Sequence, residues 1–264
     1  MCLDHRAKGM DRRGFMVALV GVSGTVLVGC VGPSDTGLGL DLASPEQVQQ
    51  LSLESWQRIR AETPPSTNRT YQQALQKVGT RLLNTVGENP ATWEMVVFQG
   101  DEANAFALPG GKIGVYEGMF RFAQNEAQLA AVVGHEIGHN QEDHAAERLS
   151  SAMVTQTSMQ LVSAALQIGN IGYANEVAAL LGAGMQYGLI LPYSRNQELE
   201  ADRMGLLTMA RAGFDPHAAV ALWQNMRSAG NAPPAFLSTH PGAEQRIALL
   251  QQLMPQAMQV YRPQ

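Results

Sequence analysis

The segment from Val132 to His144, VVGHEIGHNQEDH, holds three histidines and three carboxylates. His135 and His139 are four positions apart, so on a helix both imidazoles project from one face and can reach a common ion. Glu136 adjoins the first of them without taking the place of the ion. This is the HExxH spacing, in which two histidines bind zinc and the glutamate is the general base of hydrolysis. We therefore expect a zinc site on a helix, with Glu136 as a catalytic residue.

A catalytic zinc needs a third protein ligand and a position for water. His144 is the nearest candidate, but it lies five positions after His139 and therefore about 140° further round a helix. We expect His144 and Asp143 to lie on a solvated helix face instead.

The segment Asn196–Asp202, NQELEAD, supplies better candidates for the third ligand. Glu198 and Asp202 are four positions apart and share a helix face, while Glu200 points away. We expect Glu198 to bind the metal and Asp202 to accept the free ring N–H of a ligating histidine. Without the histidine pair, these carboxylates would indicate only a solvated, acidic helix start.

Capping signals and periodicity define the helices that carry these residues. A Ser-Pro-Glu-Gln sequence opens a helix predicted over 44–62, and apolar side chains at helical spacing predict a second over 68–86. An Asn-Glu-Ala-Gln sequence opens a longer helix predicted over 126–150, which contains the histidine pair.

Short apolar or alternating runs predict three strands, over 92–99, 103–108 and 112–117. Pro109–Gly111 reads as a tight turn between the last two. Together with the helices, they predict an α+β fold that is mostly α-helical, with a small three-stranded sheet.

The stretch from 151 to 191 is rich in Ala, Met, Leu and Gly, and Glu176 is its only charged residue. We expect a pair of buried or partly exposed helices there, and the alternative is an apolar surface for a membrane or a partner. Further along, Gly213 ends one helix, and Asp215 and Pro216 begin the next.

The first thirty residues resemble an export signal. Basic residues precede an uncharged run from Phe15 to Gly29, which is too short for a membrane span but suits a signal-peptide core. The run ends in LVGC, Leu27–Cys30, which resembles the lipobox of bacterial lipoproteins, where the cysteine is lipidated and becomes the first residue. Arg12 and Arg13 also fit a twin-arginine signal, with an ordinary basic region as the alternative.

We therefore predict a signal peptide over 1–29, a lipidated Cys30 with a tether over 30–43, and a folded domain over 44–264. The chain has two cysteines, and only Cys30 would remain after cleavage, so no disulfide can form within the mature protein. The lipid would anchor the protein to a membrane. Val31 after the cysteine, in place of aspartate, favours the outer membrane. A net charge of -5 provides no electrostatic footprint for nucleic acid, which we exclude as a partner.

Three motifs carry a resemblance to a known family: HEIGH, SRNQELEAD, and STHP with Arg246 six residues past His240. The chain resembles, over roughly 44–254, the gluzincin zinc metallopeptidases that include the CAAX prenyl endopeptidase and the HtpX heat-shock protease. Since it shows no multi-span pattern, it is most similar to the periplasmic lipoprotein branch typified by BepA and LoiP. The resemblance implies a zincin-like fold with the sheet beside the HExxH helix. It also implies one zinc per chain, bound by His135, His139 and Glu198, with Asp202 behind these ligands.

The resemblance implies two further functional elements. His240 would either donate a hydrogen bond to the oxyanion of the reaction or act as a reversible fourth ligand that closes the site. Tyr193 and Arg195 are further candidates for the donor. The sequence NAFALPGG resembles an edge strand beside the cleft, where an extended substrate could add as a further strand; the residues concerned are Asn104, Ala105, Phe106 and Ala107.

The function predicted from the sequence is that of a membrane-anchored zinc metalloendopeptidase at the periplasmic face of a bacterial membrane. Its substrates would be polypeptides, namely misfolded or envelope proteins. The alternative is a zinc-bearing chaperone or assembly factor for outer-membrane proteins, with latent protease activity. The edge strand and the apolar helices would serve that function equally well.

Overall fold

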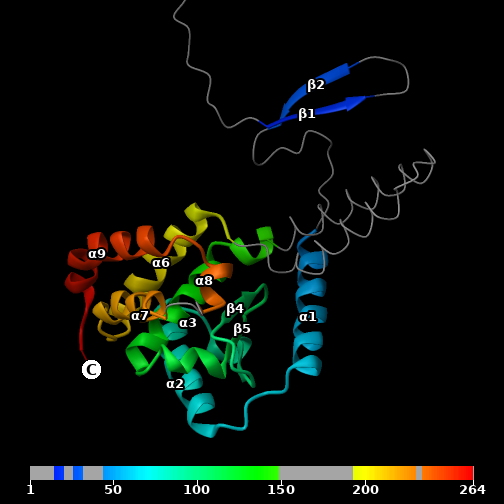
Figure 1. The fold of residues 1–264 in the computed structure, drawn as a ribbon. Helices are drawn as coiled ribbons and strands as arrows, with labels where there is room; N and C mark the ends of the chain where they lie inside the picture. Colours follow the sequence, from blue (N-terminus) through cyan, green and yellow to red (C-terminus); the bar gives the residue numbers. More distant parts are fainter. Residues whose placement is uncertain (1–14, 21–25, 32–43, 149–192, 230–233, 264) are drawn as a thin grey trace, which may run out of the picture. The chain divides into compact units, whose positions relative to one another are not determined.

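The computed structural model describes residues 15–20, 26–31, 44–148, 193–229 and 234–263 (Figure 1). The chain divides into two compact units, Met1–Ser44 and Pro45–Gln264. In the first unit, strands β1 (Phe15–Val20) and β2 (Val26–Val31) pair antiparallel. The helices predicted between 151 and 191 lie outside the described residues.

The second unit opens with two helices that match their predicted ranges to within a residue at each end. Helix α1 (Pro45–Glu62) has proline at its first position. Helix α2 (Arg69–Thr85) begins after Asn68, whose side chain accepts hydrogen bonds from the backbone N–H groups of Thr70 and Tyr71. These bonds satisfy donors that would otherwise lack a partner at the helix start.

The predicted three-stranded sheet is present as β3 (Glu94–Phe98), β4 (Ala105–Leu108) and β5 (Lys112–Tyr116). The strand order is β3-β5-β4, with β5 parallel to β3 and antiparallel to β4. The turn between β4 and β5 holds Gly110 and Gly111 at φ angles of 79° and 71°, a region that favours glycine. Because β5 lies between the other two strands, β4 is at an edge of the sheet, as predicted.

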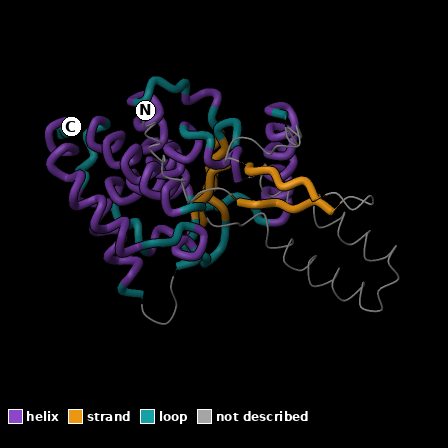
Figure 2. The backbone as a smooth tube through the Cα atoms, turned by 90° about the horizontal axis from the view of Figure 1, so that it is seen from above, coloured by secondary structure: helices purple, strands orange, loops and turns teal. Residues whose placement is uncertain are grey.

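Successive side chains of β3 point to opposite faces of the sheet, and helices cover both faces. Val97 joins the main core, which includes Leu82 of α2 and Val133 of the histidine helix. Phe98 packs instead against Trp56 of α1, with ring centroids 5.5 Å apart. In Figure 2, the short strands β3, β4 and β5 lie among the helices of the second unit. The sheet thus holds the histidine helix against one face.

Helices α3 (Glu126–Gln141) and α6 (Arg195–Arg211) carry the two predicted metal-binding motifs. They pack closely because glycines face one another: a Cβ on Gly205 of α6 would lie 2.8 Å from the backbone nitrogen of His135 on α3. This close approach brings side chains of α6 within reach of the histidine pair.

Helices α7 (His217–Arg227), α8 (Phe236–Thr239) and α9 (Ala243–Val260) complete the unit. Helix α7 begins one residue later than predicted, because Pro216 is its N-cap. None of the described helices combines the length and the apolar character needed to cross a membrane.

The prediction of one continuous helix over 126–150 is wrong. Helix α3 ends at Gln141, and Asp143 adopts a left-handed conformation with φ of 55°. Residues 144–148 are helical again after this turn. The prediction of a solvated His144 is wrong for the same reason: the turn directs it inward, and it is only 4% exposed. Asp143 itself is exposed, as predicted.

Candidate metal centre and active site

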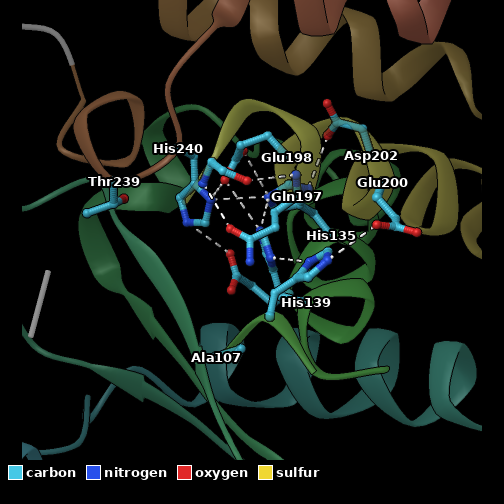
Figure 3. Close-up of polar contacts among 12 residues, drawn as sticks. Ala107, His135, His139, Gln197, Glu198, Glu200, Asp202, Thr239 and His240 are labelled. Carbon is cyan, nitrogen blue, oxygen red and sulfur yellow. Dashed lines mark hydrogen bonds and ion pairs between the residues drawn. The ribbon is translucent and has the colours of Figure 1, made fainter. Parts of the chain in front are cut away.

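Four side chains from three segments of the chain meet in the interior of the second unit (Figure 3). His135 and His139 come from α3, Glu198 from α6, and His240 from the connection between α8 and α9. One ligand atom from each lies within 4.8 Å of all the others, and all four residues are buried. The structure therefore brings together the histidine pair and the carboxylate that the sequence selects.

The separations within this cluster fit a metal ion. The Nε2 atoms of His135 and His139 lie 3.0 Å apart, and each lies 3.5 Å from a Glu198 oxygen. His240 Nδ1 lies 2.9 Å from Glu198 Oε1 and 3.2 Å from His135 Nε2. Ligands about 2 Å from a tetrahedral zinc are about 3.3 Å from one another. The donor set of imidazole nitrogens and one carboxylate is also the set that zinc prefers.

The three histidines of the cluster are in the protonation state that metal binding requires. Burial lowers the pKa of His135, His139 and His240 well below its ordinary value. The positive charge of Arg246 adds to this effect at His135 and His240. Each ring is therefore neutral at physiological pH and keeps a lone pair for an ion.

Behind the ligands, Asp202 and Arg246 form a buried ion pair. Asp202 Oδ1 lies 3.1 Å from His135 Nδ1, the ring nitrogen that faces away from the cluster. The Arg246 guanidinium donates to both oxygens of Asp202, with Nε 2.6 Å from Oδ2, and its Nη1 donates to Glu198. Burial alone would lower the pKa of Arg246, but the charges of Asp202 and Glu198 raise it. The cation thus offsets two buried carboxylates.

Glu136 differs from the other buried carboxylates because no side chain among the described residues donates a hydrogen bond to its oxygens. Its side chain is fully buried, and burial raises its pKa to about 8, although the backbone of Ala107 slightly lowers it. Its nearest ring nitrogen is His240 Nε2, 3.4 Å from Oε1. A buried polar group without a partner is rare and marks a functional position.

His144 contacts the metal-binding cluster from behind, which the sequence did not predict. Its Nδ1 lies 3.2 Å from Nδ1 of His139, and its Nε2 lies 3.4 Å from Oε2 of Glu200. Helical spacing places His144 away from His139, and only the left-handed turn at Asp143 reverses this. Glu200 points away from the ligand cluster, as predicted, but it reaches His144.

Of the further candidates for a donor, Tyr193 is at the site and Arg195 is not. The ring of Tyr193 stacks on His139, with centroids 3.7 Å apart, and its buried hydroxyl has no hydrogen-bond partner in the described part of the chain. Arg195 is exposed at the start of α6.

The predicted substrate edge strand, Asn104–Ala107, overlaps β4 at Ala105–Ala107. Other groups of the protein already contact this stretch. Arg148 donates a hydrogen bond to the carbonyl of Ala107 at 3.3 Å. The backbone N–H of Phe236 donates to the carbonyl of Ala103 at 3.0 Å, and Thr239 Oγ1 donates to Asn104 Oδ1 at 3.4 Å. The segment that carries His240 therefore contacts the chain just before β4, at Ala103 and Asn104.

The model of peptidase family M48 matches residues 69–254 of this sequence. The chain belongs to peptidase family M48. The mitochondrial metalloendopeptidase OMA1 of Schizosaccharomyces pombe is 36% identical over 187 residues, which cover 69% of this chain and 53% of that protein. The beta-barrel assembly-enhancing protease of Escherichia coli is 32% identical over 204 residues, which cover 72% of this chain and 40% of that protein.

M48 membership confirms the predicted family, the mostly helical zincin-like fold and zinc as the cofactor. It also confirms the metallopeptidase class: the fission-yeast relative is named a metalloendopeptidase and the bacterial one a protease. The chain spans about half the length of the yeast relative and two fifths of the bacterial one.

Proposed function

We propose that this protein is an endopeptidase in which His135, His139 and Glu198 hold one zinc ion and Glu136 is the general base. The observation that carries the proposal is a fully buried carboxylate, Glu136, to which no described side chain donates a hydrogen bond, beside a cluster of metal-ligand type. A bound zinc would lower the pKa of water and polarise the scissile carbonyl.

Glu136 performs the proton transfers in this mechanism. The positive charge of a bound zinc would favour the ionised form of this carboxylate, and its oxygens would then accept the proton of the attacking water and return it to the amine that leaves. Asp202 Oδ1 and Arg246 Nη2 lie 3.1 and 2.9 Å from Nδ1 of His135. With the lone pair of Nε2 given to a metal, Nδ1 would carry the proton and donate it to Asp202. Tyr193, with its free hydroxyl, is the candidate donor to the oxyanion.

For His240, the geometry favours a reversible fourth ligand over an oxyanion donor. Its Nδ1 lies among the ligand atoms, close to both Glu198 and His135. In this arrangement it takes the position that water or substrate needs. Because the same segment contacts Ala103 and Asn104, at the start of the predicted substrate strand, moving it would free the site and the start of that strand together. We therefore interpret the described conformation as a closed form.

We further propose that the protein works at the periplasmic face of a bacterial membrane, with 1–29 as a signal peptide, 30–43 as a tether lipidated at Cys30, and 44–264 as the peptidase domain. Misfolded or envelope proteins would be its substrates. The similarity to the beta-barrel assembly-enhancing protease supports a connection with the assembly of β-barrel proteins. The lipobox at the end of the apolar run supports the anchor.

The second candidate function is a zinc-bearing chaperone or assembly factor for outer-membrane proteins. The observation that favours it is the closed site, in which His240 joins the ligand cluster. In such a protein, hydrolysis would be latent, and the wild-type chain would suppress aggregation of an unfolded client without cleaving it.

Digestion of casein by the purified protein tests the proposed activity. Glu136→Gln keeps the size of the side chain but removes the base, so we expect hydrolysis to fall by about 10²–10⁴-fold while zinc content is unchanged. A chelator should abolish the wild-type activity. Glu126→Gln, at the exposed start of the same helix, is the matched control. Equal activity of the Glu136 and Glu126 variants would refute the mechanism.

A further inference from the structure

We propose that His144 and Glu200 are positioning residues that fix the tautomer and orientation of His139, the zinc ligand behind which they lie. The inference rests on the proposed function, in which His139 binds zinc through Nε2. It assigns a role to two residues outside the HExxH motif and outside the ligand cluster.

The three side chains form a line from the cluster to the surface. His139 turns Nε2 towards His135 and Glu198, and its opposite nitrogen, Nδ1, lies 3.2 Å from Nδ1 of His144. His144 in turn places Nε2 3.4 Å from Oε2 of Glu200. His144 is 4% exposed, whereas the side chain of Glu200 is 56% exposed. Figure 3 shows His139 and Glu200 on this side of the site.

The proton positions along this line follow from one another. A neutral imidazole carries one proton, so a His139 that gives the lone pair of Nε2 to a metal must hold its proton on Nδ1. That N–H donates to Nδ1 of His144, which must therefore be unprotonated. The proton of His144 then lies on Nε2 and points to the Glu200 carboxylate. A single arrangement of protons satisfies every contact.

The opposite tautomer of His139 is disfavoured by the same contacts. If Nδ1 of His139 carried no proton, its lone pair would face the lone pair on Nδ1 of His144 at 3.2 Å. His144 could avoid this only by holding its proton on Nδ1, and its Nε2 could then no longer donate to Glu200. His135, the first histidine of the motif, has a carboxylate behind it without an intervening residue, because its Nδ1 contacts Asp202 directly. Both histidines of the motif thus have a carboxylate behind them, one directly and one through His144. Loss of such an outer partner typically weakens metal binding about 10–100-fold.

Zinc affinity, measured on the full-length protein by competition with a chromogenic chelator, tests the proposal. His144→Leu fills the space without accepting a hydrogen bond, and we expect zinc binding about 10–100-fold weaker. His144→Asn retains an acceptor near Nδ1, so its affinity should return to within about fivefold of wild type. Glu200→Ala, a surface change that leaves the core intact, should weaken zinc binding less than His144→Leu. Glu142→Ala, two residues before His144, is the control.

A second readout and a reference variant separate the possible failures. In the Co²⁺-substituted protein, the visible absorption bands should shift in His144→Leu but not in His144→Asn. If His144→Leu and His144→Asn weaken zinc binding equally, or neither does while His139→Ala does, the positioning role is wrong and the proposed ligand set stands. If His139→Ala also keeps wild-type affinity, the proposed function itself fails. Should His144→Leu not fold, Glu200→Ala with wild-type affinity would overturn the inference.

Discussion

The Arg246 side chain illustrates how single residues stabilise the site. The guanidinium is 1% exposed, pairs with Asp202 and Glu198, and lies 3.9 Å from the centre of the Trp223 ring. Removing one partner from a buried ion pair leaves an uncompensated charge. Arg246 therefore supports both the fold and the orientation of the carboxylates.

Substitution of Arg246 by methionine should lower the free energy of unfolding by about 3–5 kcal/mol, because two buried carboxylates lose their counter-charge. Urea denaturation with a chelator present measures this without a contribution from bound zinc. Arg58→Met, at an exposed position of α1, should change stability by no more than about 0.5 kcal/mol. Similar values for the two variants would show that the buried pair does not stabilise the fold.

Spacing along a helix identified His135, His139 and Glu198 from the sequence, because residues four apart share a face whatever the rest of the fold does. The contacts of Arg246 and His144 could not be found in that way. The first depends on α9 crossing α6, and the second on a left-handed residue at 143. Asp is one of the few residues other than glycine that adopt this conformation, which is the only local signal.

At the scale of helices and strands, capping residues predicted the starts of α1 and α3 well. Side chains such as Asn125 and Ser194 satisfy backbone donors within a few residues, so their effect is local. The end of α3 was missed, since no glycine or proline marks it. The close packing of α3 on α6 depends on Gly134, Gly138 and Gly205. No sequence motif predicts that these glycines of two helices face one another.

In the proposed function, the connection between α8 and α9 controls access to the site through His240. If His240 is a reversible fourth ligand, His240→Ala should raise the initial rate of casein cleavage several-fold, because a coordination position becomes free while zinc stays bound. His217→Ala, an exposed histidine beside Asp215, should leave the rate unchanged. A lower rate in His240→Ala with normal zinc content would instead support the oxyanion role.

At the scale of the whole molecule, the mostly helical α+β fold and the family could both be inferred from the sequence. Helical periodicity and three motifs in the right order were sufficient for that. The closed state could not be inferred, because it depends on residues far apart in the chain: His240 beside Glu198, and Phe236 bonded to Ala103.

The central claim is that one zinc ion binds between His135, His139 and Glu198, and anomalous X-ray scattering at the zinc absorption edge tests it most directly. Crystals of the zinc-loaded protein should give one strong peak, about 2.0–2.2 Å from both Nε2 atoms and from a Glu198 oxygen. No peak there, or a peak held by other residues, would contradict the account.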